Sequence, residues 1–197
     1  MRNLYIGIVS IALFIVGCAT YEAREVPIKT VKEYQNISTI SEVTIAVDSY
    51  DNPSKAESAF YVDTTKKNIR PILIVIDNKS SDNYIINRSE ILLKEGSGTG
   101  FEPVTSHYAF EQFDVNEFLH SALFGIFGAL AADEANEKMK SDWNEKELPE
   151  QLITTPNSSA NGFVFFETEE PIHGNAVIIN AINMRTNEIL NFELQIM

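Results

Sequence analysis

The chain has 197 residues, of which 44% are hydrophobic and 22% are charged, so it can bury the core of one folded domain and is neither disordered nor fibrous. Its formal net charge is −13, and because Arg2 is the only charged residue in 1–17, the rest of the chain carries −14. This acidity argues against nucleic acid as a partner, since a polyanion is repelled and no cluster of Lys and Arg with interleaved aromatic residues reverses the sign locally.

A short positive start and an apolar stretch open the chain. Arg2 precedes residues 4–16, which are apolar apart from Gly7 and Ser10. These are the proportions of an export signal, and the stretch is shorter than the about 20 apolar residues that a membrane-spanning helix needs. Residues 1–17 are therefore expected to be a signal peptide.

The end of this stretch, Ile15, Val16, Gly17 and Cys18, matches the lipobox of bacterial lipoproteins, and Cys18 is the only cysteine. The resemblance implies cleavage before Cys18 and acyl chains such as palmitate on its thiol, with no other cofactor. Several acyl chains, each worth about 0.8 kcal/mol per buried CH₂, hold a protein stably at a membrane. The alternative is an ordinary signal peptide with a buried cysteine. Because no Asp follows Cys18, we expect the periplasmic face of the outer membrane where the organism has two membranes.

The first part of the mature chain is expected to be a tether that leads into a strand and a short helix. Residues 18–41 are polar with isolated aliphatic residues, which is typical of a spacer between a lipid and a domain. Apolar residues at every second position then predict a half-buried strand, formed by Val43, Ile45 and Val47. One or two helical turns are expected within 54–62, because Ala56, Ala59 and Phe60 share one side.

The remaining strands are predicted from apolar runs bounded by turn residues. The β-branched run 71–76 predicts a central strand, and 84–95 supplies one or two more, with core candidates Ile91, Leu92 and Leu93. The glycine-rich segment 96–100 predicts a hairpin loop, because no Lys-Ser/Thr pair follows it to bind phosphate. Further strands are expected at 162–166, 176–182 and 189–196.

Short strands separated by turns predict a mainly β protein, an antiparallel β-sandwich. The run 70–80, which ends in Asn78-Lys79-Ser80, and the later Gly162-Phe163-Val164-Phe165-Phe166 resemble bacterial lipoproteins of uncharacterised function with immunoglobulin-like domains. The resemblance implies an immunoglobulin-like sandwich over residues 42–197 and a cell-envelope location. Its motifs are structural and imply no catalytic residues.

The segment 114–147 differs from the rest and predicts an inserted helix or helical hairpin at about residues 115–147. Its first half, 118–132, is almost wholly apolar, whereas 133–147 is highly charged. The apolar half is interpreted either as a helix that covers one sheet or as a surface that touches the membrane or another envelope protein. The candidate contact residues are Phe118, Leu119, Leu123, Phe124, Ile126, Phe127 and Leu130.

The residues that commonly carry chemistry form no recognisable motif. His107, His120 and His173 lie in three different segments without metal-ligand spacing, and no Gly-x-Ser-x-Gly sequence is present. We therefore expect no metal and no enzyme activity, and predict a non-enzymatic interaction or structural module. The alternative is a carrier or sensor of a small apolar ligand bound between the inserted helix and a sheet, which would need an apolar cavity of a few hundred Å³.

Overall fold

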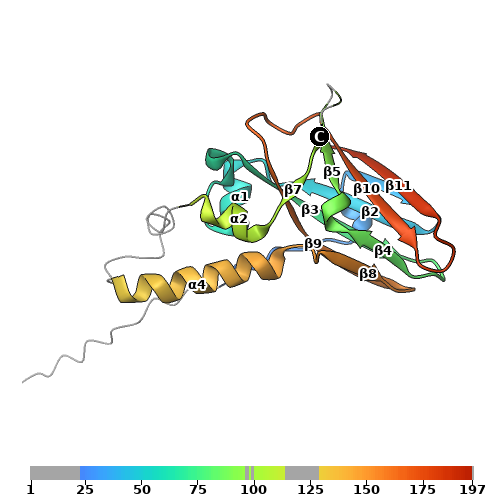
Figure 1. The fold of residues 1–197 in the computed structure, drawn as a ribbon, viewed down its shortest axis with the longest axis horizontal. Coiled ribbons are helices and arrows are strands. Elements are labelled where there is room, and N and C mark those ends of the chain that lie inside the picture. The colour runs from blue at the N-terminus through green and yellow to red at the C-terminus, as the bar shows by residue number, and fades with distance from the viewer. Residues whose placement is uncertain (1–22, 96–97, 99, 114–128, 197) are drawn as a thin grey trace, which may run out of the picture.

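The computed structural model describes residues 23–95, 98, 100–113 and 129–196, with the backbone alone over 129–134. Over this part of the chain it contains two antiparallel sheets and a group of helices beside them (Figure 1). The helical elements are η1 (Val31–Glu33), α1 (Pro53–Phe60), η2 (Thr64–Lys67), η3 (Arg88–Glu90), α2 (Ser106–Glu111) and α4 (Ala129–Lys146). The strands are β1 (Asn36–Ile40), β2 (Val43–Ser49), β3 (Ile69–Asn78), β4 (Tyr84–Asn87), β5 (Leu92–Lys94), β6 (Gly100–Phe101), β7 (Pro103–Val104), β8 (Gln151–Thr154), β9 (Ser158–Glu167), β10 (Ala176–Asn183) and β11 (Ile189–Gln195).

The strands divide into two sheets that pack face to face. Sheet A has the order β1-β2-β3-β9-β7, and β3 pairs with β9 along its whole length. In sheet B, β10 pairs with β11 along one edge and with β5 and β4 at successive places along the other. The strands β6 and β8 complete sheet B beside β5 and β4. The predicted mainly β fold, an antiparallel sandwich with an inserted helix, is confirmed.

The centre of sheet A is buried on both faces. Alternate residues of β3 enter two different cores: Ile72, Ile74 and Ile76 face sheet B, whereas Leu73 and Val75 belong to the core shared with the helices. A strand covered on both sides has no reason to alternate apolar with polar residues. This explains why residues 71–76 form a continuous apolar run.

The helices begin at residues whose side chains cap their first turn. The Asn52 side chain accepts a hydrogen bond from Lys55 N at 3.2 Å, and Pro53 occupies the first position of α1. The Thr105 side chain caps α2 in the same way, accepting a hydrogen bond from Tyr108 N at 3.1 Å. The helix α4 lies within the predicted insertion, and its buried residues at helical spacing, Ala135, Met139 and Trp143, face the sandwich.

Two predictions require correction. The predicted spacer 18–41 is too long, because β1 (Asn36–Ile40) pairs with β2, and Val31 and Tyr34 are buried. Leu92 was a core candidate, yet it is 37% exposed, because its neighbours Ile91 and Leu93 take the inward positions. The hairpin predicted at 96–100 is confirmed by the pairing of β5 with β6 on either side of it.

Candidate functional site

An aromatic cluster fills the space between α4 and sheet A. The Trp143 ring stacks on Phe165 with centroids 5.6 Å apart and an interplanar angle of 6°, and it lies 4.7 Å from Phe60. Phe110 and Phe113 close the side of α2 at 5.6 and 5.9 Å from Trp143. Trp143 is fully buried. This close packing beneath α4 favours a structural role for the helix over a ligand chamber.

The hollow between α2 and α4 lies at the surface and is lined by polar and charged residues. Its volume is about 350 Å³, and it is lined by Ser106, His107, Glu137, Lys140, Ser141 and Asn144. A small apolar ligand binds mostly to apolar and aromatic side chains. This hollow therefore does not support the carrier alternative, which needed an apolar cavity beneath the helix.

A buried ion pair fixes the C-terminal end of α4 to both sheets. The Glu147 carboxylate pairs with Arg88 and accepts hydrogen bonds from the backbone N and Oγ of Ser106, at 2.8 and 2.9 Å. Arg88 also donates to the carbonyl of Leu148 at 3.1 Å. At the same place Leu148 N donates to Phe163 O at 2.8 Å. The inserted helix is thus held to β9, α2 and the residues after β4 by specific polar contacts.

The first described residues bind to the end of α1. The Arg24 guanidinium lies 3.7 Å from the centre of the Tyr61 ring, and its Nη1 donates to Glu57 O at 2.5 Å. Lys146 of α4 donates to Ala59 O at 2.8 Å. Burial lowers the pKa of Lys146, and its hydrogen bond to Asp142 opposes that shift. Two cations from outside α1 therefore satisfy carbonyls of its last turn, where a helix carries partial negative charge.

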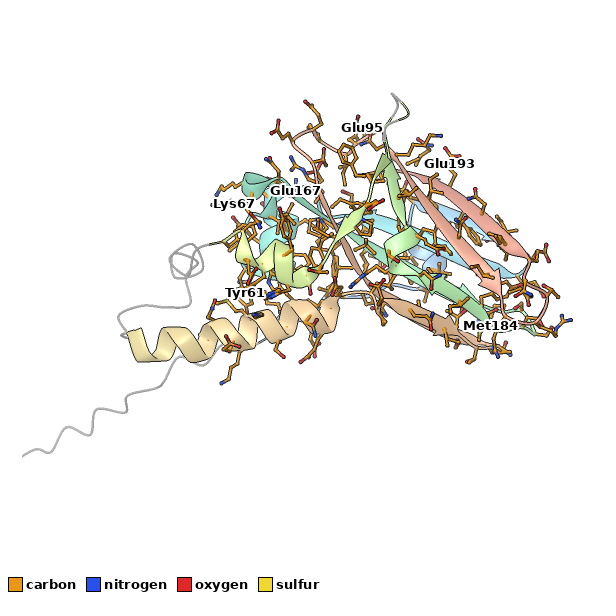
Figure 2. All side chains as sticks on the ribbon, viewed as in Figure 1. Tyr61, Lys67, Glu95, Glu167, Met184 and Glu193 are labelled. Carbon is orange, nitrogen blue, oxygen red and sulfur yellow. The ribbon has the colours of Figure 1, made fainter. Side chains whose placement is uncertain are left out.

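Four isoleucines form a row across the outer face of sheet B. The strand registers place Ile153 opposite Ile85, Ile85 opposite Ile182, and Ile182 opposite Ile189. Ile153 is 48% exposed and Ile189 is 59% exposed, and the two in the middle are partly exposed. With strands about 4.8 Å apart the row is roughly 14 Å long. Met184, at 48% exposed, follows Ile182 by two residues (Figure 2). We call Ile85, Ile153, Ile182 and Ile189 the isoleucine row.

Several titratable residues of the described part form ion pairs. Asp82 accepts hydrogen bonds from Arg185 at 2.7 and 2.8 Å and from Asn183, and these hold its pKa at about 2. His107 pairs with Glu111 on the exposed side of α2 at 3.1 Å. No group of three or more His, Cys, Asp or Glu residues that could hold a metal ion occurs among the described residues.

Most of the residues singled out from the sequence lie outside the described part. This applies to the lipobox (residues 15–18), to His120, and to Phe118, Leu119, Leu123, Phe124, Ile126 and Phe127 of the candidate contact surface. Leu130 lies within α4, where only its backbone is described. In the charged half of the segment, Met139 and Trp143 are buried, at 2% and 0% exposed.

Sequence reasoning missed the isoleucine row and the Glu147–Arg88 pair. Residues 176–182 give an apolar run in which both faces carry aliphatic side chains, and this was a signal that one face is covered or open to a partner. Which isoleucines are neighbours depends on strand register, which the run itself does not contain.

No family model matches the chain, and no curated protein matches its sequence. Solved structures with a distantly similar arrangement include the yjhA protein of Bacillus subtilis, at 12% identity and a TM-score of 0.44, covering 83% of this chain and 98% of that one. Another is a putative lipoprotein (ycdA) of Bacillus subtilis subsp. subtilis str. 168, at 12% identity and a TM-score of 0.42. This chain covers only 39% of that protein, and 83% of this chain is matched. Among the described residues no helix is long and apolar enough to cross a membrane.

Proposed function

We propose that this chain is a lipid-anchored protein of the bacterial cell envelope whose immunoglobulin-like sandwich is a non-enzymatic interaction module. The anchor depends on Ile15, Val16, Gly17 and Cys18, with Cys18 the only thiol of the chain. The observation that carries the interaction role is the isoleucine row on the outer face of sheet B. Aliphatic side chains in register on four adjacent strands form one continuous apolar surface, unlike single exposed residues scattered over a protein.

The proposed partner is another envelope protein that presents an apolar surface to this row. A second copy of the chain is disfavoured, because each mature chain carries −14 and two such domains repel one another. The apolar insertion 118–132 is a second proposed contact with membrane or partner.

The anchor is tested by mass spectrometry of the N-terminus together with membrane fractionation. Wild type should begin at Cys18 with a covalent diacylglyceryl group and sediment with membranes, and Cys18→Ala should be soluble after export. A wild-type chain without lipid on Cys18 would refute the anchor.

The interaction surface is tested by photo-crosslinking in cells from a photoreactive amino acid at Met184. We expect a covalent adduct with an envelope protein, and its loss when Ile153→Thr and Ile189→Thr are combined. Ile37→Thr is the matched control, because Ile37 is 44% exposed on β1 of the other sheet. An adduct that survives the double substitution, or that Ile37→Thr also removes, would argue against the isoleucine row as the contact.

A further inference from the structure

The chain that follows the proposed lipid anchor is bound to the helical layer from its first described residues. Arg24 stacks on Tyr61 and donates to the end of α1. Val26 packs against the core beneath α4, and Lys29 N donates to the Tyr34 hydroxyl at 3.1 Å. The predicted long spacer is therefore absent from residue 24 onwards.

This leaves a short covalent link between the lipid and the domain. Five residue steps separate Cys18 from Ala23, and at no more than about 3.6 Å per residue they reach at most about 18 Å. A domain of this size is about 40 Å across, from the usual relation between chain length and radius of gyration. The lipid can therefore bring only the side that carries Ala23 close to the bilayer, and the opposite side stays out of reach.

The charge of this side differs from that of the rest of the protein. The segment 24–32 carries Arg24, Lys29 and Lys32 against one acidic residue, Glu25, so its net charge is +2. With +1 on residues 1–17 and +1 on 18–32, the total of −13 leaves −15 on residues 33–197. Lys29 and Lys32 are exposed, and Ile28 between Arg24 and Lys29 is 40% exposed. The strip 24–32 next to the anchor is thus basic in an otherwise acidic domain, although Glu33 adjoins it and Asp142, Glu145 and Asp77 lie beside it.

Two surface hollows lie along the same strip. One, of about 370 Å³, is bounded by residues 23–26 and 28, by the end of α4 and by Asn161 and Phe163 of β9. The other, of about 420 Å³, is bounded by residues 28–32, by β3 and Lys79, and again by β9. Both share Ile28 and Asn161, so they are adjacent.

From the short link and the local charge, we propose that the strip 24–32 lies against anionic phospholipid headgroups and sets the orientation of the domain. Anionic lipids attract basic residues within a Debye length of the membrane and repel the acidic remainder of the domain. Lipid attachment and surface charge then favour the same orientation. This inference rests on the proposed lipid on Cys18.

The test uses the full lipidated chain reconstituted into vesicles whose lipids carry a nitroxide quencher on the headgroup. Cys18 is the only native cysteine, so a fluorophore can be attached to Ile28→Cys or, on sheet B, to Ile189→Cys. In phosphatidylglycerol vesicles we expect strong quenching at position 28 and almost none at 189. Replacing phosphatidylglycerol by phosphatidylcholine should weaken the quenching at 28.

The charge is tested separately. Lys29→Gln with Lys32→Gln should reduce quenching at position 28 in phosphatidylglycerol vesicles towards the phosphatidylcholine value. Lys66→Gln with Lys67→Gln is the matched control, because it removes the same charge from η2, and Figure 2 shows Lys67 on the far side of the helical layer from α4. The control should leave the quenching unchanged.

The outcomes separate the orientation from the anchor. Equal quenching at positions 28 and 189, or no effect of lipid charge or of the Lys29 and Lys32 substitutions, would overturn the proposed surface while the anchor stands. A wild-type chain that reacts with the thiol probe and does not float with vesicles has an unmodified Cys18, and this would overturn both proposals.

Discussion

Gly162 allows the end of α4 to approach β9, and its replacement by alanine should destabilise the domain. A Cβ built at Gly162 would lie 2.7 Å from Leu148 Cα, 2.8 Å from Leu148 N and 3.2 Å from Glu147 C. All three are backbone atoms, so no side chain can rotate away to make room. The requirement for glycine here is a close approach of two backbones.

The size of the effect follows from these distances. Ordinary contact begins at 3.4 Å, so the Leu148 backbone must retreat by 3.4 minus 2.7, or 0.7 Å. The same retreat would lengthen the 2.8 Å hydrogen bond from Leu148 N to Phe163 O to the limit of such a bond. Overpacking typically destabilises a protein by about 1–3 kcal/mol, and a lost hydrogen bond by about 1 kcal/mol. Alanine also reduces the conformational freedom of the unfolded chain, which stabilises the folded state by about 0.4–1 kcal/mol. We expect a net loss of about 2 kcal/mol.

Urea unfolding of the mature chain with Cys18→Ser, followed by circular dichroism, measures this loss. With a slope of about 2 kcal/mol per M for a domain of this size, the unfolding midpoint should fall by about 1 M. Gly100→Ala is the control, because Gly100 also lies in a strand but no atom comes within 4 Å of its added Cβ. An unchanged midpoint for Gly162→Ala would refute the close approach of β9 and the end of α4.

Three further predictions concern charged and titratable groups. Arg88→Met should lower the free energy of unfolding, measured in urea, by about 3–5 kcal/mol, because it leaves the buried Glu147 carboxylate without its cation. Adding Glu147→Gln should restore part of the lost stability. Arg185→Leu should raise the pKa of Asp82 from about 2, which an NMR titration measures. Because the pKa of Asp82 is lowered in the folded state, the stabilisation by this ion pair is present above about pH 4 and is lost as the pH falls towards 2. Burial raises the pKa of Tyr50 to about 12, so this tyrosine should ionise near pH 12 in an absorbance titration. Its contribution to stability should be lost as the pH rises from about 10 to 12.

The strands that could be predicted from the sequence are those whose signal is local. The last strand alternates apolar and polar residues, and Leu190, Phe192 and Leu194 are each 3% exposed or less. The central strand β3 is a β-branched run between Pro71 and a turn-rich segment, and these features lie within the strand or directly after it. These signals were sufficient for the fold class because each of these strands has at least one face in a core.

The elements that could not be predicted depend on contacts distant in sequence. Val31 and Tyr34 are isolated in a polar segment, and their burial follows from packing against β2 and the helical layer. β1 is a half-exposed edge strand of mostly polar composition, and it pairs with β2. Its sequence therefore shows no clear alternation of apolar and polar residues from which a strand could be predicted. The helix α2 has only 6 residues, which is too short for a helical period to be visible.

The candidate site was harder to predict than the fold for the same reason. The lipobox is a contiguous motif and needs no fold to be recognised. The isoleucine row consists of one residue from each of four strands, and a register shift of one residue would turn any of these side chains inward. The Glu147–Arg88 pair likewise joins residues 59 positions apart, as 147 minus 88 shows.

The layers of the fold relate the two proposed surfaces to one another. Helices cover one face of sheet A and sheet B covers the other, so the residues bound near the anchor and the outer face of sheet B lie on opposite sides of sheet A. A link of at most about 18 Å from Cys18 to Ala23 cannot pass around a domain of about 40 Å. If the lipid is attached as proposed, the isoleucine row must therefore face away from the membrane. A partner would meet it from that side, and substitutions in the row should abolish partner binding without releasing the protein from the membrane.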